Sequence, residues 1–173
     1  MPILFKPLFL TLALLACFSG AARAATTGTG LTFSGNLVAG CEYEINAGGG
    51  SLDFTGWRPS DFGGIGSVLT SRAVTIPITV RCPGTSYMKI TLIGTADRND
   101  AQALANEGTA AGIGVVLYNE GGSFTFTPND ATGETVTVPS SGAFNLYAAL
   151  KQTAAITRGT ISIDSSIIII AVP

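Results

Sequence analysis

The sequence predicts an all-β protein folded as a single β-sandwich. Apolar and polar residues alternate with a period of two over many short segments, as strands with one buried face require. Clusters of Gly, Pro, Asn and Asp separate these segments. Charged residues make up only 12% of the chain, and no linker or run of charges divides it. Many short strands joined by such turns are typical of a sandwich rather than of a helical domain.

The first 24 residues are interpreted as a secretion signal. Lys6 supplies a positive charge, residues 8–18 (LFLTLALLACF) are apolar, and residues 22–24 (ARA) form a small-residue cleavage site. The alternative is a retained membrane anchor, but the apolar run is too short to cross a bilayer. We therefore expect an exported chain that begins at Ala25 and is not inserted directly into a membrane.

Residues 31–41 (LTFSGNLVAGC) are the first candidate strand. One face of this strand would consist of the odd positions Leu31, Phe33, Gly35, Leu37 and Ala39. A glycine at the centre of a buried face is unusual for a strand that packs in its own core. From the residues alone, two interpretations are equally open. The segment is either the first strand of its own sandwich or a strand that fills the core of another molecule.

The next predicted strands follow the same alternation along the rest of the chain. Their inward rows are Val74, Ile76, Ile78, Val80 and Cys82; Met88, Ile90 and Leu92; Ile113, Val115 and Leu117; Phe124 and Phe126; Val136 and Val138; and Phe144, Leu146, Ala148 and Leu150. Pro77 lacks an N–H group, so we expect a sheet edge or a bulge there. Ile161 and Ile163 begin the last segment. The one plausible helix is a short turn near residues 101–106 (AQALAN).

Two cysteines remain after the predicted cleavage, Cys41 and Cys82, because Cys17 lies within the signal. In an exported chain such a pair predicts a disulfide, worth roughly 4 kcal/mol on the chain-entropy model. A redox-active pair is the alternative, but the sequence has no C-x-x-C spacing. Nine Lys and Arg oppose eleven Asp and Glu without a basic cluster, which argues against nucleic acid as a partner.

The chain contains no histidine, which removes the usual general base and most zinc sites. Glu42 and Glu44 share a strand face and could form a carboxylate pair, but acidic groups on a solvated face are far commoner. Asp97, Asn99 and Asp100 could bind Ca²⁺, yet the glycine and distal glutamate of an EF-hand loop are missing. A turn capped by side chains is the simpler interpretation. We expect neither enzyme activity nor a metal or other cofactor.

Trp57, in the stretch FTGWRPSDF, could stack on a sugar ring. A lone tryptophan beside Phe54 and Phe62 more often packs over the end of a sheet. A free-standing secreted β-sandwich that binds carbohydrate through Trp57 or the glycine-rich loops is the alternative function.

The order and spacing of several segments resemble pilins of the chaperone–usher type, in the type 1 and P fimbrial group. These segments are residues 31–41, 76–82 (IPITVRC), 90–122 and 144–163. The resemblance covers essentially the whole chain after the signal. It implies an incomplete immunoglobulin-like β-sandwich that is completed by a donated strand. A pilin of the spore-coat-U type is a third interpretation, which shares the assembly logic but not the stretch 90–122.

The resemblance implies a signal peptide at 1–24, an N-terminal donor-strand extension at 25–39 and a pilin domain at 40–173. The odd positions named above, Leu31 to Ala39, would then fill the groove of a neighbouring subunit. The groove edge, which would also bind the chaperone, would consist of Ile161, Ile163, Ile167 and Ile169. Family members usually have a tyrosine next to last, whereas Ala171 or Val172 stands there in this chain. This departure concerns chaperone binding rather than the fold.

The implied function is that of a structural subunit of a bacterial surface fimbrium. Such a subunit polymerises by donor-strand exchange and supports cell adhesion and biofilm formation. The implied partners are a periplasmic chaperone, an outer-membrane usher and neighbouring fimbrial subunits. The implied route is export to the periplasm and then to the cell surface.

Overall fold

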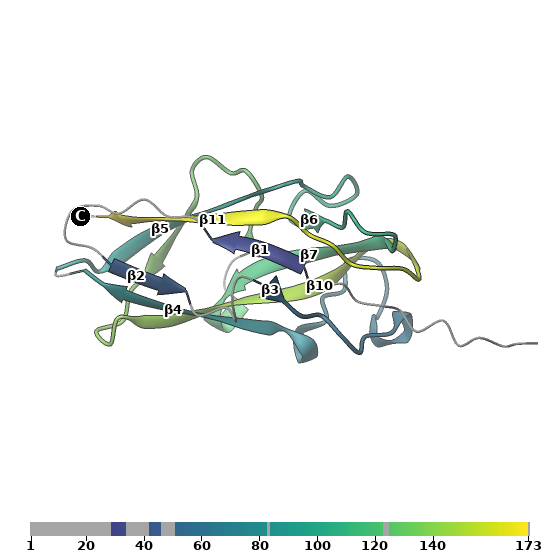
Figure 1. Ribbon diagram of the computed structural model, residues 1–173, viewed down its shortest axis with the longest axis horizontal. Coiled ribbons are helices and arrows are strands. Elements are labelled where there is room, and N and C mark those ends of the chain that lie inside the picture. The colour runs from purple at the N-terminus through teal and green to yellow at the C-terminus, as the bar shows by residue number, and fades with distance from the viewer. Residues whose placement is uncertain (1–28, 34–41, 46–50, 83, 123–124, 173) are drawn as a thin grey trace, which may run out of the picture.

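The computed structural model describes residues 29–33, 42–45, 51–82, 84–122 and 125–172. These residues form two β-sheets that face each other as layers of a sandwich (Figure 1). Three short 3₁₀-helices lie in the connections: Pro59–Asp61, Thr70–Arg72 and Glu120–Gly122. The predicted all-β sandwich is confirmed.

The first sheet has the strand order β3-β1-β11-β5-β9. Its strands are β3 (Ser51–Leu52), β1 (Thr29–Phe33), β11 (Ser165–Val172), β5 (Tyr87–Gly94) and β9 (Glu134–Thr137). Strands β5 and β11 pair antiparallel over their whole length. Strand β1 is the exception, because it runs parallel to β11.

The second sheet has the order β2-β4-β10-β7-β6, and β8 also pairs with β7. Its strands are β2 (Glu42–Ile45), β4 (Val74–Arg81), β10 (Ala143–Thr157), β7 (Ala111–Asn119), β6 (Leu104–Ala105) and β8 (Thr125–Phe126). Strand β10 is the longest and pairs with β4 on one side and with β7 on the other. It continues well beyond the predicted row, which ended at Leu150.

The core lies between the two sheets and contains the predicted inward rows. Ile76, Ile90 and Leu146 are fully buried, and the rest of their rows is buried or packs against this core. Phe124 lies outside the described residues, and Val138 is only partly buried, since β9 ends one residue before it. The alternation works because successive residues of a strand point to opposite faces.

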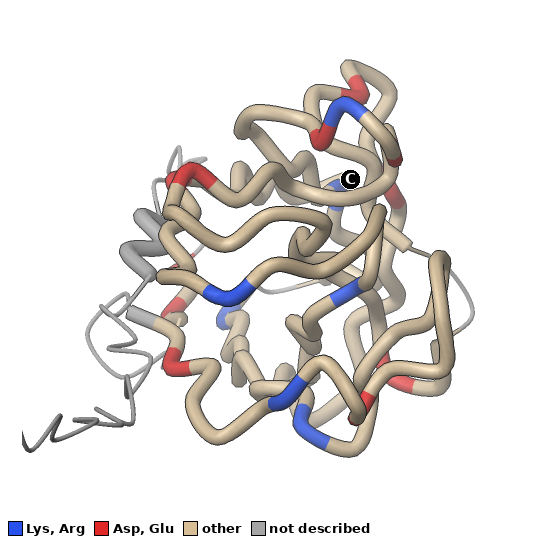
Figure 2. The backbone as a smooth tube through the Cα atoms, turned by 90° about the vertical axis from the view of Figure 1, so that its right-hand side faces the viewer, with Lys and Arg blue, Asp and Glu red and all other residues tan. Residues whose placement is uncertain are grey.

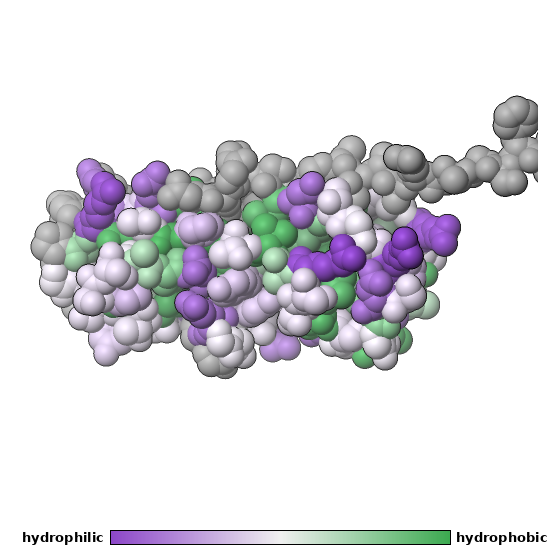
Figure 3. Space-filling view, turned by 90° about the horizontal axis from the view of Figure 1, so that it is seen from below, coloured by the Kyte–Doolittle hydropathy of each residue, from purple (hydrophilic) through white to green (hydrophobic). Residues whose placement is uncertain are grey.

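The charged residues of the described chain, and the hydrophobic ones on the face seen in Figure 3, are dispersed. Lys and Arg are spread around the described part of the chain and do not gather in one patch (Figure 2). On the face seen in Figure 3, hydrophobic residues stand in small groups between hydrophilic ones. Among the described residues, none of the helices is long and apolar enough to cross a membrane.

Pro77 lies in β4 just beyond the described pairing with β2. Among the described residues this pairing reaches Ile78, the residue that follows the proline in the sequence. On the other side, Val80 N–H donates to the carbonyl of Gly142 at 2.7 Å. Hydrogen-bonded and non-bonded pairs alternate along an antiparallel ladder, so position 77 directs its missing N–H away from β10. The expectation of an edge or a bulge at Pro77 stays a prediction, because residues 46–50, which follow β2, lie outside the described residues.

The expected helical turn at residues 101–106 is wrong. This segment forms a turn and then strand β6, whose Leu104 pairs with Val115 of β7. The side chain of Asp100 accepts the N–H of Gln102 at 3.0 Å, which holds the turn. Leu104 is buried in the core. Strand pairing and burial outweigh the helix preference of the alanines, because propensity is a weak determinant compared with tertiary packing.

Candidate assembly site

Strand β11 and the segment before it present one row of residues to the core. The row is Ile161, Ile163, Ser165, Ile167 and Ile169, all at most 5% exposed. The four isoleucines predicted as the groove edge therefore all face the interior, although the first two precede the strand, which begins at Ser165. Their part in binding a chaperone or a neighbouring subunit stays a prediction.

The segment before β11 is held in place by the side chain of Asn106. Its Nδ2 donates to the carbonyls of Ala110 at 2.7 Å and Thr160 at 3.1 Å. Its Oδ1 accepts the N–H of Ser162 at 2.7 Å. Gly159 allows the backbones to approach, because a Cβ there would lie 2.3 Å from the nitrogen of Ala110. These contacts explain how residues outside a regular strand still bury their isoleucines.

Strand β1 lies between β3 and β11 and joins them into one sheet. Leu31 stands opposite Ser165 and Phe33 opposite Ile167 in the parallel ladder with β11. On its other edge β1 pairs antiparallel with β3, and β3 pairs with no other strand of the described chain. If β1 left, β3 and β11 would be separated by a gap one strand wide. This gap is the candidate site for a donated strand.

The predicted donor residues are only partly described. Leu31 and Phe33 belong to β1, whereas Gly35, Leu37 and Ala39 lie outside the described residues. In this structure β1 completes the sheet of its own chain, as the first-strand interpretation expects. Donation of the same segment to a neighbouring subunit stays a prediction. A donor of this kind would lie between β3 and β11, where β1 lies in this structure.

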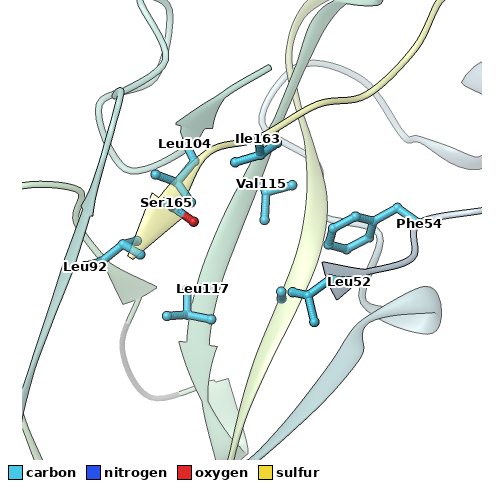
Figure 4. A pocket seen from close by; sticks show the side chains of 9 residues that line it. Leu52, Phe54, Leu92, Leu104, Val115, Leu117, Ile163 and Ser165 are labelled. Carbon is cyan, nitrogen blue, oxygen red and sulfur yellow. The ribbon is translucent and has the colours of Figure 1, made fainter. Parts of the chain in front are cut away.

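A small cavity of about 20 Å³ lies in the core between β3 and β11 (Figure 4). It is lined by Leu52, Phe54, Leu92, Leu104, Val115, Leu117, Ala148, Ile163 and Ser165. All of these side chains are apolar except that of Ser165. Ser165 is only 3% exposed, and its Oγ has no hydrogen-bond partner. The described lining of this cavity is thus apolar apart from one side-chain oxygen.

Cys82, which directly follows β4, is disulfide-bonded. Cys41 lies outside the described residues, so the predicted Cys41–Cys82 pairing stays a prediction.

The turn at residues 97–100 is a capped turn, as predicted. Asp97 accepts the N–H of Asn99 at 2.8 Å, and Asp100 forms an ion pair of 2.6 Å with Lys151 of β10. Burial alone would raise the pKa of Asp100. The hydrogen bonds from Lys151 and from the backbone of Gln102, together with the lysine charge, outweigh it and lower this pKa. No cluster of potential metal ligands occurs in the described ranges.

Two other sequence candidates have structural explanations. Glu42 and Glu44 are both exposed on β2, as expected for a solvated strand face. Trp57 packs against the core and meets Phe62 edge-on, with ring centroids 6.1 Å apart and planes at 80°. Phe54 is buried beside them in the same core. Trp57 therefore packs over the sheet rather than lying free on the surface.

Two residues of the site were missed by reasoning from the sequence. Ser165 occupies the central place of the row Ile161 to Ile169, and extending that alternation through the serine would have found it. Asn106 is recognised only from its contacts with residues more than fifty positions away. Its position in the sequence gives no signal of that role.

Known proteins resemble this chain in sequence pattern and in fold. The family model described as fimbrial protein matches residues 18–169. One similar structure is that of a chaperone–usher pilus, with 20% identity, a TM-score of 0.62, and coverage of 87% of this chain and 100% of that chain. Another is the P pilus rod subunit PapA, with 16% identity, a TM-score of 0.57, and coverage of 76% and 91%.

A third similar structure is an antigen and type I fimbria protein of Burkholderia pseudomallei. It has 17% identity, a TM-score of 0.50, and coverage of 78% of this chain and 98% of that chain. At such identities the structural likeness shows the shared fold alone. Among curated proteins, none matches this sequence.

Proposed function

Because this chain belongs to the fimbrial protein family, we propose that it polymerises by exchange of the strand that lies between β3 and β11. The chain is a structural subunit of a pilus and not an enzyme. In the polymer, residues 25–39 of one subunit would take the place that β1 holds in the isolated chain of its neighbour. The order and spacing of the sequence segments that resemble pilins agree with this role.

The observation that supports this proposal is the position of β1 in the sheet. It is the only described strand that links β3 to β11, and its described residues pair on β11 with Ser165–Ile167. Its main-chain hydrogen bonds can be made by an extended segment without proline at the bonded positions, since every other residue has the same N–H and C=O groups. A segment from another subunit can therefore replace it without changing the rest of the sandwich.

Exchange of this kind leads to a fibre. Each subunit offers an extension on one part of its surface and a groove on another, so the contacts are heterologous and do not close. A chain in which β11 has no partner exposes an apolar edge with four consecutive isoleucines, which favours aggregation. We therefore propose that a periplasmic chaperone and an outer-membrane usher escort the subunit to the cell surface.

Adhesion and biofilm formation would be properties of the assembled fibre. The alternative, a free-standing carbohydrate-binding module, has less support, because Trp57 packs against the core. No observation in the described part of the chain favours a second function.

The proposal is tested with a variant in which the two faces of the segment are exchanged: Leu31→Thr, Thr32→Leu, Phe33→Ser and Ser34→Phe together. If the segment serves a neighbour, chaperone-bound subunit should stay at its normal level while fibres counted by electron microscopy are lost. If the segment serves only its own core, subunit levels should fall at the chaperone step. Normal fibre numbers would contradict the proposal.

A second measurement uses peptides of residues 25–39 added to a variant that lacks residues 25–33. A peptide at 100 times its Kd adds about 2.7 kcal/mol of stability by mass action, which should raise the Tm by roughly 5–11 °C for a chain of this size. A peptide with the same four exchanges is the matched control and should have little effect. Equal effects of both peptides would argue against recognition of the groove by one face.

A further inference from the structure

We infer that Ser165 and the cavity beside it form a subsite that selects which strand completes the first sheet, favouring a strand with a serine or threonine opposite Ser165. This inference rests on the proposed exchange of strands at the groove. It identifies the partner by chemistry: an extended segment with one hydroxyl group among apolar residues.

The first observation is the unsatisfied hydroxyl of Ser165. It stands between Ile163 and Ile167 in an otherwise apolar row and is 3% exposed. Its Oγ has no hydrogen-bond partner, and it points into the space between Leu104 and Leu117 (Figure 4). Leaving a buried hydroxyl unpaired is costly, and buried polar groups are nearly always bonded. Ser165 therefore lacks a partner that a suitable ligand would supply.

The second observation is the size and chemistry of the cavity. Its volume of about 20 Å³ has room for one group of the size of water. A buried water needs two to four polar partners, whereas the described lining offers only Ser165 Oγ. A water alone would be held poorly here. A hydroxyl carried by a neighbouring side chain is held by its own backbone and needs only this one partner.

The third observation is the register of the covering strand. Position 31 of β1 stands opposite Ser165 in the parallel ladder with β11. The residue at this position is leucine, whose side chain has no hydrogen-bonding atom. The segment of this chain therefore cannot satisfy Ser165 from that position. A segment with Ser or Thr there could do so, and would be preferred to this chain's own.

Space alone does not explain the serine. Gly94, the partner of Ser165 on β5, also avoids crowding, because a Cβ there would lie 2.6 Å from Leu104 and 3.1 Å from Ser165 Cβ. This crowding limits the size of the residue at position 94, not at position 165. At position 165 alanine would be as small as serine and would leave no hydroxyl unpaired. The oxygen is the part of Ser165 that the packing leaves unexplained.

The test is a double-mutant cycle in the full mature chain, read as unfolding equilibrium constants from urea denaturation. Leu31→Thr and Leu31→Val are compared because threonine and valine have nearly the same shape and differ by a hydroxyl. Each is combined with Ser165 and with Ser165→Ala. For each background, the unfolding equilibrium constant of Leu31→Val is divided by that of Leu31→Thr. This ratio should be about 2- to 12-fold larger with Ser165 than with Ser165→Ala. Ser165→Ala alone should lower the unfolding equilibrium constant about fivefold or more.

Equal preferences in the two backgrounds would overturn the subsite. So would four variants of unchanged stability, since position 31 would then not be seated beside the cavity. Fibre yield is measured separately on the same variants. Coupling without any fibres would overturn the proposed polymerisation but support the pairing with Ser165, whereas fibres without coupling would overturn the subsite alone.

Discussion

The burial pattern of β11 predicts a sharp contrast between two isoleucines of the same run. Ile167 is fully buried, whereas Ile170 is 40% exposed on the opposite face. Ile167→Ala removes three buried carbons, which costs about 2.4 kcal/mol at about 0.8 kcal/mol for each. The cavity left behind raises the expected loss to about 3–4 kcal/mol. Ile170→Ala leaves no closed cavity, so we expect a loss of about 1 kcal/mol or less.

Urea denaturation of the oxidised chain measures both variants. The fluorescence of Trp57, the single tryptophan, reports unfolding. With an m-value of about 1–3 kcal/mol per molar urea, Ile167→Ala should lower the midpoint by about 1–4 M. The shift for Ile170→Ala should be several times smaller. The two substitutions remove the same atoms from the same strand, so each controls for the other.

Equal losses, or a larger loss for Ile170→Ala, would refute this account of β11. A slip of one residue in the pairing with β5 would have that result, because it moves every side chain of a strand to the other face. After such a slip Ile168 and Ile170 would take the core places of Ile167 and Ile169, so no polar residue would enter those places. The experiment therefore tests the register directly.

Three further predictions concern contacts outside β11. Asn106→Ala should lower the unfolding free energy by about 1–3 kcal/mol, since three backbone groups, two of them in partly buried hydrogen bonds, lose their partner. Asn99→Ala in an exposed turn is the control, and similar midpoints in urea would contradict the role of Asn106. Above about pH 4, ionised Asp100 should contribute up to about 1 kcal/mol to the free energy of unfolding, because its pKa is lowered in the folded chain. This contribution should be lost as the pH falls through the lowered pKa. Asp100→Asn should therefore flatten the acid limb of stability against pH, and an unchanged limb would count against the ion pair with Lys151. Cys82→Ser should cost roughly 2–5 kcal/mol and lower the exported level, and mass mapping should find Cys41 joined to Cys82 rather than two free thiols.

The core was predictable from the sequence because alternation decides which face of a strand is apolar. Met88, Ile90 and Leu92 lie inside, as their spacing indicated, while Lys89 and Thr91 between them are half-buried. The capped turn at residues 97–100 was predictable for a similarly local reason, since Asp side chains bind N–H groups two residues away. The segment 101–106 was not, because its partner strand is distant in the sequence.

The sequence by itself determined the all-β class, the inward rows and the absence of histidine chemistry, because each depends on residue type and short spacing. Only the tertiary structure decided which strands are neighbours, since alternation identifies a face but not a partner. It placed β1 beside β11 rather than leaving it free. It also buried Ser165 without a partner, because the row of β11 is fixed by pairing with β5 and by the contacts of Asn106 before the strand begins.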